Sequence, residues 1–460
     1  MQHNLSDTIV ALATPPGTGA IAVIRLSGPR AIIIADGVFR GKRLENQPSH
    51  TAHFGRLENE AGRAIDEVLA TLFRAPKSYT GEEVVEFSVH GSPYIQQEVL
   101  QLLLDKGARL AQPGEFTLRA FLNGKMDLSQ AEAVADLIAS ESEAAHSVAL
   151  RQLRGGFKNE IQNLREELVH FASLVELELD FSEEDVEFAD RSEMKTLINR
   201  INTKIDQLIG SFELGNVIKE GFQVAIIGEP NAGKSTLLNA LLNEERAIVS
   251  DIAGTTRDTV EDEMVIDGIR YRFIDTAGIR KTDDTIESLG IERTMQKAEQ
   301  ADVVLLLFDA STYDSDRLKS EIRNLEIRKK DIAKTLILVA NKSDKTDENV
   351  EEKFSEFDII PISAKEKTGI TELTQQLTDF VNLSALEEDQ TIVTNTRHIE
   401  ALRNAKNSLI EVLNGFDNQM SGDFVAIDIR KALFHLGEIT GEITTDDLLG
   451  NIFSKFCIGK

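Results

Sequence analysis

Residues 228–235 read GEPNAGKS, and no other stretch constrains the fold of this chain as strongly. They match the pattern G-x-x-x-x-G-K-[ST], which belongs between a buried strand and a helix. The apolar run FQVAII before them and TLLNALL after them supply that context. In such a loop the backbone amides surround phosphates, a lysine such as Lys234 neutralises their charge, and a hydroxyl such as that of Ser235 can bind Mg²⁺. The pattern predicts a phosphate-binding strand–loop–helix unit.

The apolar runs that follow extend this unit to a whole domain. YRFID, ADVVLLLFD, TLILVAN and DIIPIS are of strand length, and polar segments of helical length separate most of them. Alternation of this kind is typical of a parallel, doubly wound α/β sheet, whose ligands bind at the carboxyl ends of the strands. We therefore expect an α/β domain over residues 221–380.

Three further motifs, each after a predicted strand, indicate that the nucleotide is GTP. DTAG at 275–278 would put Asp275 near the Mg²⁺ and the Gly278 amide near the γ-phosphate. NKSD at 341–344 resembles the guanine motif N-K-x-D, whose aspartate accepts hydrogen bonds from the base, and SAK at 363–365 would add a backbone contact to O6. The candidates for GTP binding from these motifs are Asn231, Ala232, Gly233, Lys234, Ser235, Thr236, Asp275, Thr276, Ala277, Gly278, Asn341, Lys342, Asp344, Ser363, Ala364 and Lys365.

The residue that would hold the attacking water is unusual. Ras-like enzymes use a glutamine directly after the D-x-x-G motif, whereas Ile279 follows DTAG in this chain. An isoleucine side chain cannot orient water. The charged groups of residues 280–290 are therefore candidates for that role.

Hydrolysis also needs a cation to stabilise the developing negative charge. Arg257 and Arg280 are available, and a monovalent cation held by Asn231 and the loop 251–258 is an alternative. The turn after Pro230 gives Asn231 a purely structural explanation as well. The residues alone do not decide between an arginine, a monovalent cation and a purely structural role of Asn231.

The nine prolines leave residues 114–229 and 362–460 free of proline, which favours long helices there. Both stretches place alanine and leucine at helical spacing, and Ser129 with Glu132 predicts a capping box at the start of the first. We expect one helical domain made of residues 119–220 and 381–460, with the α/β domain inserted into it. Two unrelated helical domains are the alternative.

Charge and composition exclude several classes of protein. The 460 residues carry a formal charge of −27, so the surface gives no general grip on nucleic acid, and contact with RNA must be local or shared with a partner. A single cysteine excludes an internal disulfide. The apolar runs are too short to span a bilayer, and the start of the chain lacks the features of a signal peptide. We expect a cytoplasmic protein without a membrane partner.

The chain reads FCIGK at its last positions, and this places the only cysteine, Cys457, close to Lys460. A helical stripe over 444–456 would anchor this segment; its members are Leu448, Leu449, Ile452, Phe453 and Phe456. Cys457 is then either a small apolar side chain that packs the segment or a nucleophile.

These segments together resemble the MnmE (TrmE) family of tRNA-modification GTPases, over nearly the whole chain. The matching stretches include DTIVALATPPGTGAIAVIRLSG, TGEEVVEF, PGEFTLRAFLNGKMDLSQAEAVADLI, GEPNAGKSTLLNALL, DIAGTTRD, DTAGIR, ESLGIER and EITGEITTDDLLGNIFSKFCIGK. The resemblance implies three parts. They are an α+β folate-binding N-terminal domain over 1–118, a discontinuous all-α domain over 119–220 and 381–460, and an inserted Ras-like P-loop GTPase domain over 221–380.

The resemblance also implies an activity and partners. Family members add a carboxymethylaminomethyl or aminomethyl group to C5 of the wobble uridine of certain tRNAs, together with the flavoprotein MnmG (GidA). The one-carbon unit would come from 5-formyltetrahydrofolate or another tetrahydrofolate derivative. A homodimer is implied, joined through the N-terminal domains, which forms a heterotetramer with MnmG. The GTPase domains would meet when GTP and K⁺ are bound.

Several residue roles follow from the resemblance alone. Asn231, Ser250, Ile252 and Thr255 match K⁺ ligands, Ser235 and Thr256 match Mg²⁺ ligands, and Ser250, Thr255 and Thr256 join the candidates for GTP binding. Glu287 matches the glutamate that orients water, and Lys234 and Cys457 are the other catalytic candidates. Arg25, Glu86, Lys125 and Lys460 match residues that contact folate.

A different class of protein explains the nucleotide motifs equally well. A switch GTPase of ribosome assembly or signalling would act only by nucleotide-dependent binding. It would explain neither a separate N-terminal domain nor the FCIGK segment.

Overall fold

The computed structural model describes residues 6–180, 191–242, 262–274, 301–328, 336–346, 348–380 and 391–460. The chain forms two compact units, each assembled from separate stretches of sequence. The first contains Met1–Ala135, Arg151–Asn202 and Glu400–Lys460, and the second contains Asp136–Leu150 and Thr203–Ile399. The predicted boundaries at residues 118, 220 and 380 differ from these divisions and stay a prediction.

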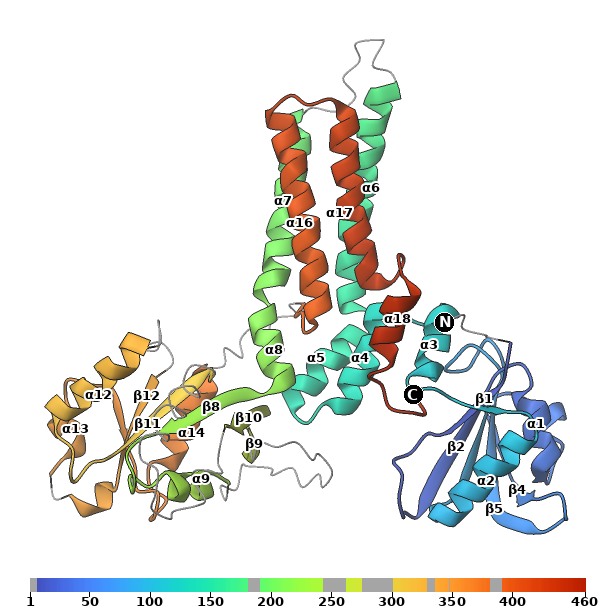
Figure 1. Cartoon of the computed structure of the whole chain (residues 1–460), viewed down its shortest axis with the longest axis horizontal. Helices are drawn as coiled ribbons and strands as arrows, with labels where there is room; N and C mark the ends of the chain where they lie inside the picture. Colours follow the sequence, from blue (N-terminus) through green and yellow to red (C-terminus); the bar gives the residue numbers. More distant parts are fainter. Residues whose placement is uncertain are drawn as a thin grey trace. The chain divides into compact units, whose positions relative to one another are not determined.

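A seven-stranded sheet forms the N-terminal part of the first unit (Figure 1). Its order is β3-β4-β5-β6-β2-β1-β7, and all neighbours are antiparallel except β1 and β7. The strands are β1 Ile9–Leu12, β2 Ile21–Ser27, β3 Phe39–Arg40, β4 Thr51–Glu58, β5 Ala64–Phe73, β6 Val84–His90 and β7 Arg109–Leu110.

Helices α1 (Ala31–Val38) and α2 (Pro93–Asp105) pack on one face of this sheet. The period of two along β1 sends Val10 into that core, and it sends Ile9 and Ala11 to the opposite face. There they pack against Phe116 of α3 (Glu115–Leu122). A short 3₁₀ turn, η1 (Leu44–Asn46), lies beside α1. The predicted α+β class of this part is confirmed.

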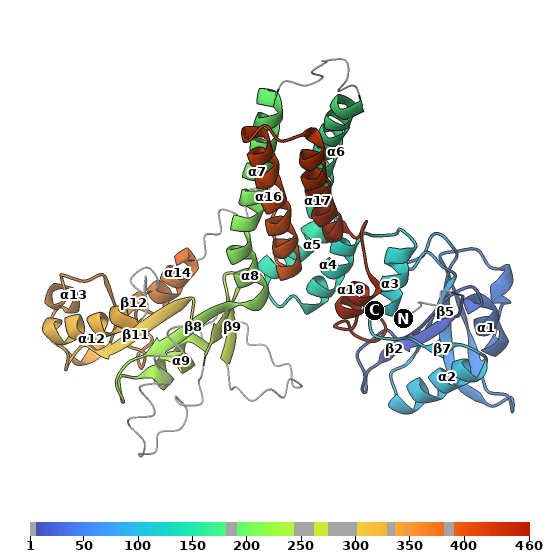
Figure 2. The same cartoon turned by 45° about the horizontal axis from the view of Figure 1, so that its top comes forward.

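The helical segments are confirmed, but the first is broken more often than its sequence suggests. It forms α4 (Leu128–Ala139), α5 (Glu143–Leu153), α6 (Gly156–Asp180), α7 (Arg191–Gly210) and α8 (Phe212–Glu220). Helices α16 (Thr396–Asp417) and α17 (Gly422–Thr440) come from the second segment. In both views α6 and α7 run beside α16 and α17 (Figures 1 and 2), and the rings of Phe171 and Phe416 meet at 6.2 Å.

The predicted capping box at Ser129 and Glu132 is wrong by two residues. Asp127 caps α4: its Oδ1 accepts a hydrogen bond from the Gln130 amide at 2.8 Å, and Gln130 Oε1 accepts one from the Asp127 amide at 3.1 Å. Ser129 lies inside the helix and donates to Asp127 Oδ1. The reciprocal pair has the geometry of a capping box with aspartate in place of serine.

Helix α18 (Asp446–Phe453) confirms the predicted anchor of the last residues. The Thr445 hydroxyl accepts from the Leu448 amide and caps the helix. Leu449, Phe453 and Phe456 are buried in one cluster with Leu118 and Leu128, while Leu448 and Ile452 pack against that cluster. Residues 457–460, called the C-terminal tail below, therefore leave a helix whose position is fixed.

The second unit contains a six-stranded sheet in the order β13-β12-β11-β8-β10-β9. The strands are β8 Phe222–Ile227, β9 Asp262–Ile266, β10 Ile269–Phe273, β11 Val303–Asp309, β12 Leu336–Asn341 and β13 Ile359–Pro361. All neighbours are parallel except β9 and β10, which form an antiparallel hairpin. The five predicted strands are confirmed, and β9 was not predicted.

Helices cover both faces of this sheet, as the doubly wound pattern predicts. One core joins the sheet to α9 (Lys234–Leu242) and α14 (Ile370–Phe380), and the other joins it to α12 (Ser315–Arg328) and α13 (Val350–Lys353). The 3₁₀ turn η4 (Ser343–Lys345) follows β12. The loops after β8, β11, β12 and β13 thus all lie at the carboxyl ends of the parallel strands.

Candidate nucleotide and tail sites

The phosphate-loop motif lies between β8 and α9, where its pattern requires it. Gly228 follows the last residue of β8, and a Cβ at this position would lie 2.0 Å from the carbonyl oxygen of Leu307. Asn231 and Gly233 have positive φ angles of 65° and 103°. These turns bring the chain to Lys234, Ser235 and Thr236 in the first turn of α9, where free amides favour an anion.

The Lys234 ammonium lies against the loop that precedes it. Its Nζ donates to the carbonyl oxygens of Gly228 at 2.7 Å and Glu229 at 2.9 Å. Burial lowers the pKa of Lys234 below its usual value, although the carboxylates of Glu229 and Glu321 act in the opposite direction. A negatively charged ligand in this loop would further favour the charged form.

Asn341 connects the phosphate loop to the two loops predicted to contact the base. Its Nδ2 donates to the carbonyl oxygen of Ala232 at 2.7 Å, and its Oδ1 accepts from the Ala364 amide at 3.0 Å. A Cβ on Gly233 would lie 2.2 Å from Asn341 Nδ2, so only glycine allows this approach. The amide is buried, and both of its ends are hydrogen-bonded. Asn341 thus holds the phosphate loop and the loop after β13 together.

Asp344 and Ser363 face one another beside this link. Asp344 Oδ1 accepts a hydrogen bond of 2.6 Å from the Ser363 hydroxyl, which lowers the pKa of Asp344 and keeps it ionised. Lys342 has a φ angle of 63°, and its Nζ pairs with Asp309 Oδ2 at 2.7 Å. Lys365 is exposed and pairs with Glu366. An ionised carboxylate at position 344 is what the two donors of guanine require.

Several predicted residues lie outside the described part of the chain. They are the K⁺ candidates Ser250, Ile252 and Thr255, the Mg²⁺ candidate Thr256, the DTAG residues Asp275, Thr276, Ala277 and Gly278, and Glu287. Arg257, Arg280 and the stretch 280–290 also lie there. Their roles stay predictions.

The structure also brings the residues predicted to contact folate to one part of the first unit. Arg25 of β2 is opposite Glu86 of β6, and Arg25 Nε donates to Glu86 Oε1 at 2.7 Å. The Arg25 guanidinium lies 5.6 Å from the ring centres of both Tyr79 and Phe116. Lys125 Nζ donates to the carbonyl oxygen of Pro76, in the connection from β5 to β6 that also carries Tyr79.

The C-terminal tail binds next to this group through its backbone. The Gly114 amide donates to the carbonyl oxygen of Cys457 at 3.3 Å, and the Phe116 amide donates to that of Lys460 at 3.1 Å. A Cβ on Gly459 would lie 2.2 Å from the carbonyl oxygen of Leu12. Lys460 is therefore attached to the residue whose ring contacts Arg25. The Cys457 side chain is exposed, so it does not pack the tail as an apolar group.

Sequence reasoning missed residues at both sites. Tyr79 directly precedes TGEEVVEF and Phe116 lies within PGEFTLR, two stretches that carry the resemblance, yet neither aromatic ring was assigned a role. Asp309 ends the apolar run of β11, and an acidic residue at the end of a buried strand was the available signal. The ion pair of Arg317 on α12 with Glu229 has no sequence signal, because 88 positions separate the two.

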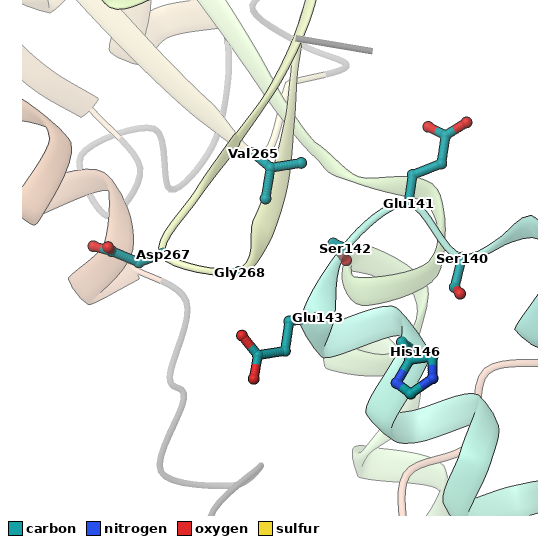
Figure 3. A pocket seen from close by; sticks show the side chains of 8 residues that line it. All are labelled: Ser140, Glu141, Ser142, Glu143, His146, Val265, Asp267 and Gly268. Atoms are coloured by element: carbon teal, nitrogen blue, oxygen red, sulfur yellow. The ribbon is translucent and has the colours of Figure 1, made fainter. Parts of the chain in front are cut away.

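A separate cavity in the second unit contains none of the predicted site residues. It has a volume of about 810 Å³ and is lined by Ser140, Glu141, Ser142, Glu143, His146, Val265, Asp267 and Gly268. Figure 3 shows the turn of the β9–β10 hairpin beside the residues that connect α4 to α5. The Ala144 amide donates to the carbonyl oxygen of Gly268, and Arg270 pairs with Glu141 at 3.0 Å. These contacts hold the hairpin against the start of α5.

Within the ranges that the structure describes, no group of three or more histidine, cysteine, aspartate or glutamate residues is arranged to hold a metal ion. Within the same ranges, no helix is both long and apolar enough to cross a membrane.

The doubly wound sheet, the phosphate loop and the Asn341 link together define a P-loop GTPase domain. Two family models match the chain: "GTP-binding protein TrmE N-terminus" over residues 8–125 and "MnmE helical domain" over residues 128–457. The chain belongs to the MnmE (TrmE) family.

Curated relatives match over the full length. A protein of Flavobacterium psychrophilum named tRNA modification GTPase MnmE is 58% identical over 461 residues, which are 99% of either chain. One of Cytophaga hutchinsonii with the same name is 58% identical over 458 residues, 99% of this chain and 98% of that protein. A crystal structure of Era with MgGDPNP and part of 16S ribosomal RNA matches 41% of this chain and 66% of that chain. Its identity is 30% and its TM-score 0.27, too low to support an argument.

Proposed function

We propose that this chain hydrolyses GTP as part of a reaction that modifies tRNA. The observation that carries the proposal is the 58% identity, over nearly the whole of both chains, to proteins named tRNA modification GTPase MnmE. The arrangement of Lys234, Asn341 and Asp344 supports the GTPase half, since Asn341 links the phosphate loop that carries Lys234 to the loops that carry Asp344 and Ala364.

The finer proposal concerns the reaction itself. The chain, as a cytoplasmic homodimer with the flavoprotein MnmG, adds a carboxymethylaminomethyl or aminomethyl group to C5 of the wobble uridine of certain tRNAs. The carbon comes from a tetrahydrofolate derivative such as 5-formyltetrahydrofolate. The grouping of Arg25, Glu86, Tyr79 and Phe116 supports folate as the ligand, because it offers one cation for a carboxylate, an acceptor for ring N–H groups and aromatic faces for stacking.

In the GTPase step, the chain's own residues bind the nucleotide and its metal. Lys234 and the amides of the α9 N-terminus hold the phosphates, and Asp344 holds the guanine. The Ser235 hydroxyl, in the first turn of α9, would bind Mg²⁺ together with Thr256. The bound Mg²⁺ would neutralise charge on the phosphates. Asn231, with Ser250, Ile252 and Thr255, is proposed to hold K⁺.

Glu287 is proposed to orient the attacking water. This assignment is needed because Ile279, which stands where Ras-like enzymes have a glutamine, cannot orient water. Glu287→Ala should bind GTP with unchanged affinity and lose hydrolysis, because it removes a contact made only in the transition state. Normal turnover in this variant would exclude the role.

The decisive experiment reconstitutes the modification in vitro. The purified chain, MnmG, unmodified tRNA, GTP, a tetrahydrofolate derivative and a reduced nicotinamide should yield wobble uridine with a new C5 substituent, detected by nucleoside mass spectrometry. Lys234→Ala, which removes the phosphate-binding cation, should abolish it. A complete reaction mixture that leaves the uridine unchanged would contradict the proposal.

A binding measurement separates this function from that of a switch GTPase in ribosome assembly or signalling. The chain should bind 5-formyltetrahydrofolate by calorimetry, and Arg25→Met should weaken that binding. A switch GTPase has no use for folate, so absence of binding would favour the alternative.

A further inference from the structure

The best-buried ion pairs of the first unit surround Arg119, on α3. This side chain is only 1% exposed. Its Nη1 donates to the carbonyl oxygen of Asp7 at 2.9 Å and to both carboxylate oxygens of Glu82 at 3.2 and 3.3 Å. Its Nη2 donates to Asp7 Oδ1 at 2.5 Å and Glu115 Oε1 at 3.1 Å. One planar guanidinium thus connects three segments that are far apart in the sequence.

Arg109 binds two of these three carboxylates, those of Asp7 and Glu115. It donates to Asp7 Oδ2 at 2.6 Å and to Glu115 Oε1 and Oε2 at 2.6 and 3.1 Å. The Gln112 amide also donates to Glu115. Burial would raise the pKa of Glu115, but these hydrogen bonds and that from Arg119 outweigh it and leave the pKa below its usual value. The first turn of α3 is therefore fixed to Asp7, two residues before β1.

That same turn carries the backbone groups that bind the C-terminal tail. Gly114 directly precedes Glu115, and the amides of Gly114 and Phe116 bind the carbonyls of Cys457 and Lys460. On the opposite side, Gly459 approaches Leu12, at the end of β1, too closely for any side chain. The tail thus lies between the first turn of α3 and the end of β1. Arg119 fixes α3 to the segment before β1, so it sets the distance between α3 and β1, the two elements that the tail contacts.

We propose that Arg119 is a positioning residue for the C-terminal tail. Buried ion pairs are a poor source of stability, since desolvation consumes most of their attraction. A guanidinium does, however, present five donors in one rigid plane, which fixes the groups around it in direction as well as distance. Arg119 holds the α3 amides where the tail carbonyls can reach them. Only the consequence for catalysis depends on the proposed tRNA modification and on the roles that the resemblance implies for Cys457 and Lys460.

The only cysteine of the chain allows a direct test. Cys457 is exposed, so a maleimide fluorophore would label the full-length protein at the tail alone. In Arg119→Met, which keeps an unbranched apolar stem and removes all the donors, the steady-state anisotropy of the label should fall towards that of a free peptide. The matched control is Arg74→Met. Arg74 is a partly buried arginine of the same domain that donates to the carbonyls of Glu45 and Gln47, and its loss should leave the anisotropy unchanged.

Two more variants separate positioning from a general loss of folding. Arg119→Lys keeps the charge with fewer directed donors, so it should restore part of the anisotropy. Glu115→Gln weakens the α3 end of the cluster with no change in shape, and it replaces Arg119→Met if that variant does not fold. Circular dichroism and its thermal transition confirm folding of the whole chain, and GTP turnover confirms that the second unit is intact. A folded Arg119→Met or Glu115→Gln protein whose label is as immobile as that of the wild type would overturn the proposal.

The catalytic consequence has its own readout. With the tail released, tRNA modification should fall by roughly a hundredfold, the loss expected when a reacting group is misplaced by about 1 Å, while GTP turnover stays normal. If the label becomes mobile and modification is unaffected, the positioning role stands and the roles expected for Cys457 and Lys460 fail.

Discussion

At the scale of single residues, Asp344 determines which base the nucleotide site accepts. Its ionised carboxylate can accept from both guanine donors, whereas adenine offers neither group in that position. We predict that GTP binds at least about a hundredfold more tightly than ATP, as for other sites built around a matched hydrogen bond. Asp344→Asn should remove most of this preference in a fluorescent-nucleotide titration. Glu366→Gln, on the nearby surface, is the control, and equal affinities of the wild type for GTP and ATP would refute the role of Asp344.

Asn231 tests whether a monovalent cation takes part in hydrolysis. Its left-handed backbone, with a φ of 65°, satisfies the turn explanation as well as the cation explanation, so the geometry does not choose between them. If Asn231 holds K⁺, turnover of the wild type should fall when Na⁺ replaces K⁺, and Asn231→Gly should lose that response although glycine suits the same φ. A variant that keeps both its turnover and its response to K⁺ would favour Arg257 or Arg280.

At the scale of elements, binding of the tail between α3 and β1 depends on Gly459. We predict that Gly459→Ala displaces the tail, because the new Cβ would meet the Leu12 carbonyl at 2.2 Å and the φ of 95° disfavours alanine. Hydrogen exchange of the Gly114 and Phe116 amides should accelerate. Gly450→Ala is the matched control in α18, since a Cβ there meets nothing within 4 Å and alanine favours a helix by about 1 kcal/mol. Unchanged exchange in Gly459→Ala would mean that these amides are not protected by the tail.

The ion cluster at the start of α3 should make the first unit sensitive to acid. Burial raises the pKa values of Asp7 and Glu115, but the hydrogen bonds from Arg109 and Arg119 prevail and hold both below their usual values. Groups of this kind contribute stability that is present above the unfolded pKa of about 4 and is lost as the pH falls through the lower folded value. We predict that Tm falls below about pH 4, and less steeply in Glu115→Gln than in the exposed-site control Glu60→Gln. Equal slopes would exclude this contribution.

Patterns within one element were readable from the sequence, and contacts between distant elements were not. The phosphate loop, the five parallel strands and the stripe of α18 each depend on neighbours a few positions apart. At the start of α4, two overlapping capping patterns, Asp127 with Gln130 and Ser129 with Glu132, fit the same stretch, and only the structure distinguishes them. The Arg119 cluster joins positions 7, 82, 115 and 119, which no local pattern connects.

At the scale of the whole molecule, the tail and the GTPase site lie in different compact units. We predict that deletion of residues 457–460 abolishes tRNA modification and leaves GTP turnover within about twofold of the wild type, because no described contact of the tail involves the second unit. Cys457→Ser separates the thiol from the rest of the tail. Both activities are measured on one preparation, and modification at the normal rate by the truncated chain would remove any role for the tail.

The binding of the tail to the N-terminal part of the chain also has a consequence for biosynthesis. Residues 12, 114 and 116, which contact the tail, are translated long before the tail itself. Phe116 precedes its partner Lys460 by 344 positions. The N-terminal sheet can fold early, and the tail can bind only after the GTPase domain and the remaining helices have been translated. Translation that stops before residue 457 would therefore leave the Gly114 and Phe116 amides without their partners, and we expect such a chain to hydrolyse GTP without modifying tRNA. Synthesis of residues 457–460 is in this way a condition of the proposed coupling between GTP hydrolysis and tRNA modification.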